Sequence, residues 1–169
     1  MANCRRIEPM KIEHAKLDDP DVRALIAYHQ QDMHRMSPPG TSWALDLTGL
    51  SGPETTVLGA WDGSALMGIG ALKRLDSDTV ELKSMRTLPE HLGKGVAKAI
   101  LEELLLICQR EGYARVSLET GASDEFVPAI TLYQQRGFVR GEAFSNYENG
   151  PHNQCYHLDL ADQPSSKAG

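Results

Sequence analysis

The spacing of apolar positions changes along the chain and predicts a succession of strands and helices. A short candidate strand spans Met10–His14. The run Asp18–Pro20 then supplies capping and first-turn residues for a helix, since apolar residues recur at helical spacing as far as Met33. That helix should end before the Pro-Pro-Gly run at 38–40, and residues 40–53 read as a turn-rich connection.

The next segment predicts three consecutive antiparallel strands. They are expected at Thr56–Trp61, Ala65–Lys73 and Val80–Thr87. Asp62-Gly63 is a hairpin signal between the first two, and the polar run Asp76–Asp78 marks the turn before the third.

After these strands the apolar period becomes helical. Apolar residues from Ala97 to Cys108 follow an i, i+3, i+4 pattern that ends at Gly112, which predicts the strongest helix of the chain. A short β-rich strand is expected at Arg115–Thr120, and a second helix at Phe126–Gln135, ended by a glycine. Two closing strands are expected last, at residues 138–142 and 155–160.

The resulting order, β-α-β-β-β-α-β-α-β-β, predicts an α/β sandwich. Its sheet should be mixed, mostly antiparallel, and built of about six or seven strands flanked by helices. A chain of 169 residues fits one domain. We expect that domain to span residues 1–161, with 162–169 as a flexible polar tail.

The most informative segment is Pro89–Ala97, which lies between a predicted strand and the strongest helix. The first N–H groups of a helix lack internal partners and the helix dipole is positive there, so such a junction binds anions. Gly93 and Gly95 would let the backbone approach a phosphate closely. A Gly-x-Gly on its own is more simply explained as a tight strand-to-helix turn. Neither a Walker loop nor a dinucleotide fingerprint is present.

The stretch Glu81–Ala97 resembles the strand-loop-helix core of the GNAT superfamily of acyltransferases. That family carries Gln/Arg-x-x-Gly-x-Gly/Ala, whose backbone amides wrap the pyrophosphate of coenzyme A. The resemblance therefore implies an acetyl-CoA site at the segment aligned with this motif, which consists of Leu92, Gly93, Lys94, Gly95, Val96 and Ala97. Leu92 departs from the family pattern because leucine cannot support the phosphates as Gln or Arg does. Lys94 partly compensates through its charge.

A second motif supports the same resemblance. Residues Pro128–Phe138 resemble the family run Ala-x-x-Leu/Phe-Tyr-x-x-x-Gly-Phe, at about the usual distance after the first. The family often has Asn at the position that Phe126 occupies here, so one contact to the pantetheine arm is absent. The two motifs and their flanks cover about residues 56–140. The sequence also looks like the small bacterial acetyltransferases of unassigned substrate.

The resemblance implies transfer of an acetyl group to an amine by direct attack in a ternary complex. It makes the backbone N–H of Met85 the candidate oxyanion donor and places Thr87 on the pantetheine arm. Tyr133 matches the tyrosine that protonates the departing thiolate, although it also reads as a buried tyrosine with a satisfied hydroxyl. Glu81 matches the position of a general base. It also reads as a solvated strand carboxylate, or as a group that attracts a cationic substrate.

Two function classes stay open at this point. The first is an N-acetyltransferase acting on a primary amine of a small molecule or peptide. The second is a catalytically weak or inactive CoA-binding regulatory module with the same fold, which Leu92 and Phe126 motivate and Tyr133 and Glu81 oppose. An unrelated phosphate-binding enzyme would require the tyrosine motif to be a coincidence. The resemblance also leaves a homodimer open, and the acceptor stays unassigned.

Composition and charge limit the classes of partner that the chain is expected to bind. The formal net charge of -6 argues against nucleic acid and favours a cationic substrate. Three widely spaced cysteines, Cys4, Cys108 and Cys155, suggest neither disulfides nor zinc, which fits a reducing cytoplasmic location. The six histidines show no metal-ligand spacing, so no metal is expected. No apolar run approaches the roughly 20 residues of a membrane span. Aromatic Trp43, Phe144 and Tyr147 would overhang the acceptor or anchor the core.

Overall fold

The computed structural model of the chain describes residues 9–40 and 47–162. Their strands form one seven-stranded sheet in the order β1-β2-β3-β4-β5-β7-β6. The strands are β1 (Lys11–His14), β2 (Thr55–Asp62), β3 (Ala65–Arg74), β4 (Thr79–Thr87), β5 (Arg115–Gly121), β6 (Val139–Arg140) and β7 (Asn153–Asp159). Only β4 and β5 pair in parallel, which confirms the predicted mixed, mostly antiparallel sheet.

The helices follow the predicted order, with one short addition. They are α1 (Pro20–Met36), α2 (Leu47–Leu50), α3 (Val96–Arg110) and α4 (Val127–Arg136), with 3₁₀ turns η1 (Pro89–His91), η2 (Asp124–Phe126) and η3 (Leu160–Asp162). The start of α1 is as predicted, because Asp19 accepts a hydrogen bond from the N–H of Asp21 at 2.8 Å. The prediction missed α2, since four residues are too few to show a period.

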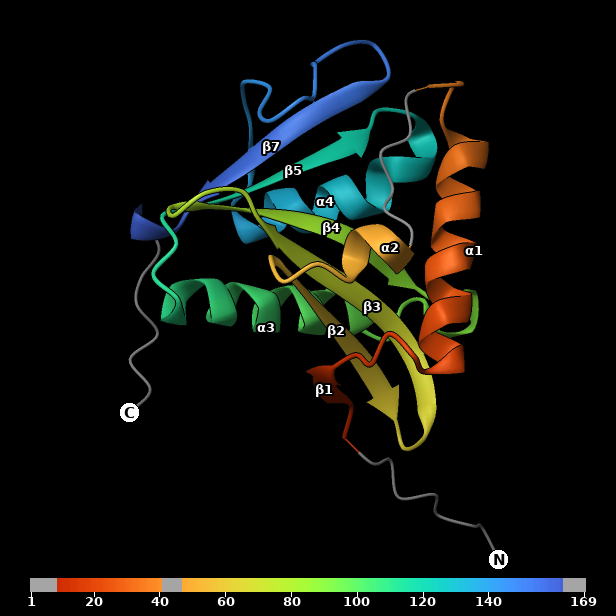
Figure 1. The fold of residues 1–169 in the computed structure, drawn as a ribbon. Helices are drawn as coiled ribbons and strands as arrows, with labels where there is room; N and C mark the ends of the chain where they lie inside the picture. Colours follow the sequence, from red (N-terminus) through yellow and green to blue (C-terminus); the bar gives the residue numbers. More distant parts are fainter. Residues whose placement is uncertain (1–8, 41–46, 163–169) are drawn as a thin grey trace, which may run out of the picture.

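The helices cover the two faces of the sheet (Figure 1). On one face α1 packs through Val22, Leu25 and Ile26 onto β2 and β3. On the other face α3 packs through Ile100 and Leu104 in a larger core that also includes α4. Burying a leucine or isoleucine side chain contributes roughly 1.5–3 kcal/mol, so these two layers hold the sheet rigidly between them. No described helix is long and apolar enough to cross a membrane.

The parallel pair β4–β5 positions the site. Its register covers the first part of each strand, from Thr79↔Arg115 to Glu81↔Ser117. Both strands continue beyond that point, β4 to Thr87 and β5 to Gly121, without further paired positions between them. The two strands therefore part in the middle of the sheet and leave an opening.

Candidate active site

A pocket of about 390 Å³ occupies the opening between β4 and β5. One wall comes from α1, through His29, Met33 and Met36. The opposite wall comes from α4, through Ala129 and Tyr133. Because α1 and α4 cover opposite faces of the sheet, the pocket reaches from one face to the other through the parted strands. A substrate on each side could thus meet in the plane of the sheet.

The loop before α3 forms one end of this pocket. Gly93 and Gly95 have φ angles of +77° and +78°, which other residues adopt only with strain. No described side chain caps the N-terminus of α3, so its first N–H groups are available to an anion. Lys94 Nζ lies 3.1 Å from His91 Nδ1 beside them. A loop of this geometry can bring backbone N–H groups close to a phosphate.

The aligned loop residues differ in what they offer a ligand. Leu92 and Ala97 line the pocket, and the Leu92 side chain is 66% exposed. Val96 is buried against β3, where an added Cβ on Gly68 would lie 2.8 Å from Val96 Cγ1. Val96 can therefore contact a cofactor only through its backbone. Leu92 therefore offers a ligand an exposed apolar side chain.

A bulge distorts β4 beside the pocket. Ile69 pairs with Arg86 and Ala71 pairs with Lys83, so Gly70 alone faces Ser84 and Met85. A bulge leaves one residue out of the ladder and turns its backbone groups away from the neighbouring strand. Ser84 adopts φ 55°, and its buried Oγ has no described hydrogen-bond partner. Both Met85 and Thr87 line the pocket here, as their predicted roles require.

Tyr133 projects from α4 into the pocket wall. It is 7% exposed, and its hydroxyl makes no hydrogen bond to a described residue. Burial raises the pKa of the phenol, which keeps it protonated at neutral pH. The described residues thus supply no partner of the kind that the alternative reading of Tyr133 requires. Phe126 also lines the pocket and is buried against Gly121, where an added Cβ would lie 2.2 Å from the Phe126 ring.

Glu81 lies at the inner end of the parted strands. It is 3% exposed, so the reading as a solvated carboxylate is wrong. Its Oε1 accepts hydrogen bonds from Lys83 Nζ at 3.1 Å and from the Tyr147 hydroxyl at 2.5 Å. Lys83 Nζ also lies 2.6 Å from the Tyr147 oxygen. Burial and the charge of Glu81 raise the pKa of Tyr147, which stays a hydrogen-bond donor.

A second carboxylate faces this group from β5. Glu119 lines the pocket, and its Oε1 accepts a hydrogen bond from Asn153 Nδ2 at 2.7 Å. Burial raises the pKa of Glu119, and the nearby charge of Glu81 raises it further. Sequence analysis missed Glu119, although its alternation with the buried Val116 and Leu118 placed it on the opposite face of β5.

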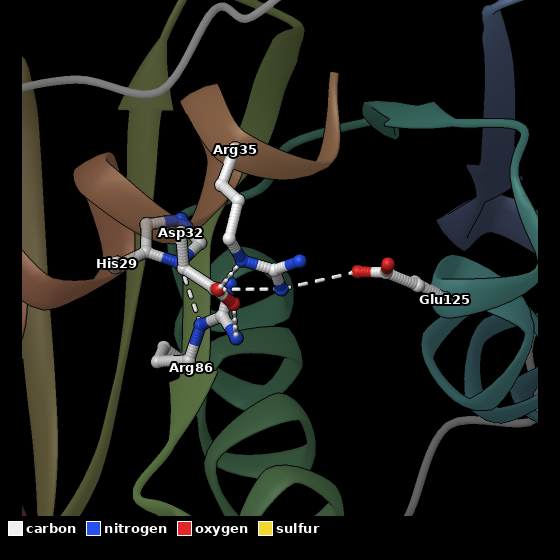
Figure 2. A network of polar contacts seen from close by, with 5 residues as sticks. All are labelled: His29, Asp32, Arg35, Arg86 and Glu125. Carbon is white, nitrogen blue, oxygen red and sulfur yellow. Dashed lines mark hydrogen bonds and ion pairs between the residues drawn. The ribbon is translucent and has the colours of Figure 1, made fainter.

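A network of polar contacts closes the side of the pocket between α1 and β4 (Figure 2). Arg86 donates from Nε to His29 Nδ1 at 2.9 Å and from Nη1 to Asp32 Oδ2 at 2.8 Å. Burial, together with the charge of Arg86, lowers the pKa of His29 to about 3. Arg35 then joins Asp32 to Glu125 in η2, with Nη2–oxygen distances of 2.8 and 3.2 Å. This network links the helix of one face to the start of α4.

The cysteines and loop aromatic residues named from the sequence lie in different parts of the structure. Cys108 is in the core, where burial raises its thiol pKa to about 12, and Cys155 is buried in β7. Tyr147 reaches the site, while Phe144 packs edge-on against its ring. Cys4 and Trp43 lie outside the described residues. Among the described residues no group of three His, Cys, Asp or Glu side chains is arranged to hold a metal ion.

Comparison with known proteins gives the same family at the level of sequence. Residues 18–138 match the model of the acetyltransferase (GNAT) family. The chain is 45% identical over 141 residues to the uncharacterised N-acetyltransferase YsnE of Bacillus subtilis (strain 168), covering 82% of this chain and 93% of that protein. It is 44% identical over 150 residues to the uncharacterised N-acetyltransferase YedL of Escherichia coli (strain K12), covering 87% and 94%.

Comparison of structures adds the fold. A GNAT family acetyltransferase from Elizabethkingia anophelis, solved with acetyl-CoA bound, superposes with a TM-score of 0.64 at 17% identity. The match covers 89% of this chain and 98% of that one. The parted strands and the glycine loop are thus set in a GNAT-like sandwich. The chain belongs to the acetyltransferase (GNAT) family and is an N-acetyltransferase.

Proposed function

We propose that this chain transfers the acetyl group of acetyl-CoA to a primary amine of a small molecule or peptide, by direct attack in a ternary complex. The observation that carries the proposal is the pocket that passes through the sheet between β4 and β5. One side of it meets the α3 loop and α4, and the other meets α1 and Glu81. Acetyl-CoA would bind on the first side and the amine on the second, so that the thioester lies between them.

On the donor side, the backbone amides from Gly93 to Ala97 would hold the pyrophosphate at the N-terminus of α3. Thr87 would contact the pantetheine arm, and Lys94 would add charge near the phosphates. A protein of similar fold from Elizabethkingia anophelis was solved with acetyl-CoA bound, which supports acetyl-CoA as the donor. Leu92 would contribute an apolar contact in place of the family's polar side chain.

At the thioester, the backbone N–H of Met85 would stabilise the tetrahedral oxyanion, because the bulge at this point removes residues from the ladder. Tyr133 would give a proton to the departing thiolate, a role for which its raised pKa and unpartnered hydroxyl suit it. Glu81 would hold the incoming ammonium electrostatically. Its Oε1 is occupied by Lys83 and Tyr147, which fix its position.

The same proposal places the reaction in the cytoplasm. The two described cysteines are unbridged thiols, which suits the reducing cytoplasm. Direct attack needs no metal, and neither cysteine is placed to form a covalent intermediate, since Cys108 and Cys155 are fully buried. A homodimer would be compatible with the exposed edge strand β6.

The test is release of CoA thiol from acetyl-CoA with n-butylamine, lysine and a dipeptide as acceptors, followed by mass measurement of the product. We expect amine-dependent release matched by an N-acetylated product. Acetyl-CoA binding without amine-dependent release from any of the three would contradict the proposal and favour an inactive CoA-binding module.

A further inference from the structure

We propose that Glu119 is the general base that removes the proton from the acceptor ammonium. The inference rests on the proposed function and adds a residue that the family resemblance does not supply. The first observation is the direction in which side chains point on the two strands that part, β4 and β5. Val80 and Leu82 of β4, like Val116 and Leu118 of β5, point into the α3 core. Because side chains alternate along a strand, Glu81 and Glu119 point to the other face.

The charges on this face leave room for one cation. Glu81 and Glu119 bring two carboxylates to the pocket, and Lys83 brings one ammonium that is already bound to Glu81. Arg86 and Glu125 also line the pocket, but they are paired with Asp32 and Arg35. Burying an unpaired charge is costly. A substrate ammonium placed between the two carboxylates would balance the charge of this group.

The two carboxylates differ in how they are occupied. Glu81 Oε1 accepts from both Lys83 and Tyr147, so this oxygen is already occupied by two donors. Glu119 accepts one bond, from Asn153 to Oε1, and its Oε2 accepts none from the described residues. Burial of Glu119 makes its charged form less favourable, so it holds a proton more readily than an exposed carboxylate. Asn153 would act as a positioning residue through its bond to Oε1, which leaves Oε2 to the acceptor.

An unpartnered polar side chain lines the same pocket as Glu119. Ser84 is 8% exposed, lines the pocket, and its buried Oγ has no described hydrogen-bond partner. Buried hydroxyl groups without a partner are rare in folded proteins. The Ser84 hydroxyl is therefore available to a substrate bound in this pocket.

The protons balance as follows. Oε2 of Glu119 takes one proton from the ammonium, and the neutral nitrogen attacks the thioester carbon. The C–N bond forms and the C–S bond breaks. The nitrogen loses its second proton to solvent, while Tyr133 protonates the thiolate and is reprotonated by solvent. Glu119 then releases its proton, so one proton leaves in each turnover.

The experiment compares two acceptors that differ in their need for a base. n-Butylamine is almost wholly protonated at neutral pH, whereas hydroxylamine is mostly neutral there. The variant Glu119→Gln keeps the shape and the acceptor for Asn153 but removes the base. We expect kcat for n-butylamine to fall about 10²-fold or more, beyond any rise in KM that the lost charge causes, while kcat for hydroxylamine changes less than about threefold. The Glu81→Gln variant should raise KM for n-butylamine more than it lowers kcat.

Two results would overturn the assignment. Equal losses with both acceptors would mean that Glu119 is only structural, and an unchanged n-butylamine rate would place the base elsewhere. Failure of the proposed function looks different, because the wild type would then use neither acceptor. In that case an NMR measurement decides alone. The ¹³C carboxyl resonance of Glu119 is identified as the one that is missing from the spectrum of Glu119→Gln. It should shift on addition of n-butylammonium to the acetyl-CoA complex, and no shift would overturn the proposal.

Discussion

Arg86 donates a hydrogen bond from Nε to Nδ1 of His29 at 2.9 Å, which joins β4 to α1 behind the pocket. An arginine is always a donor, so His29 must accept at Nδ1 and carry its proton on Nε2. The imidazole is thereby fixed as a neutral group inside the protein. Three further charged residues, Asp32, Arg35 and Glu125, extend the contact across to η2 (Figure 2).

This pairing predicts a stability that falls in mild acid. The pKa of His29 drops to about 3 on folding from an ordinary value of 6.5. Between these two pH values His29 binds a proton in the unfolded chain but not in the folded chain. Stability is therefore full above about pH 6.5 and declines by roughly 1.4 kcal/mol per pH unit as the pH falls from there toward 3. Urea unfolding should show the wild type losing about 1 kcal/mol more than His29→Gln between pH 7.5 and 5.5.

The control for that experiment is His34→Gln, which changes an exposed histidine on the same helix. It should keep the slope of the wild type. Equal slopes for the wild type and His29→Gln would mean that His29 is protonated in the folded protein, contrary to its contact with Arg86.

The two carboxylates of the network should differ in their contribution to stability. Asp32 is 14% exposed and binds both arginines, whereas the Arg35–Glu125 pair is 62% and 50% exposed. Asp32→Asn leaves the mostly buried Arg86 without its carboxylate and should cost about 2 kcal/mol. Glu125→Gln should stay within about 0.5 kcal/mol of the wild type. Urea unfolding at pH 7.5 measures both, and equal costs would show that the inner pair is no stronger than the surface one.

Tyr133→Phe tests the proton donor. The hydroxyl makes no described hydrogen bond, so its loss should leave the free energy of unfolding within about 0.5 kcal/mol. The loss of a general acid should lower kcat by about 10²-fold. Tyr156→Phe is the matched control, because Tyr156 is equally buried but bonds Gln154 away from the pocket. A Tyr133→Phe enzyme with unchanged kcat would assign the proton to another donor.

Gly70→Ala tests the bulge. An added Cβ would lie 2.5 Å from Met85 Sδ and 2.7 Å from Ile100 Cγ2, so Met85 must move. Overpacking of this kind costs about 1–3 kcal/mol, and it should lower kcat by shifting the proposed oxyanion donor. Gly150→Ala, which meets nothing within 4 Å, should leave both quantities unchanged. Normal kcat in Gly70→Ala would show that the position of Met85 does not matter to the reaction.

Much of the fold follows from local sequence, for identifiable reasons. The change from period 2 to helical spacing near Ala97 located the loop, because strand and helix patterns differ strongly there. Tyr133 was found because it lies within a contiguous motif. The position of α2 was not found, since four residues show no period.

Other parts of the site depend on contacts between distant segments, which a single sequence does not contain. Glu119 gains its role only because β5 lies parallel to β4, and Tyr147 reaches Glu81 across 66 positions. Lys83 was within reach of sequence reasoning, since positions 81 and 83 share one face of a strand. The bulge at Ser84 could not be predicted from a glycine in its own strand, because the glycine lies on the opposite strand, at position 70.

The most direct test of the account is calorimetric titration with acetyl-CoA of the wild type and of the double variant Gly93→Glu/Gly95→Glu. Carboxylates at the N-terminus of α3 would repel the pyrophosphate that the loop is proposed to hold. Gly112→Glu is the matched control, because Gly112 has the same φ of +78° as Gly95, also meets nothing within 4 Å, and follows the opposite end of α3.

The account predicts saturable binding by the wild type and by Gly112→Glu, with affinity at least about 10-fold lower in the double variant. Equal binding by all three proteins, or no binding by the wild type at millimolar acetyl-CoA, would contradict it.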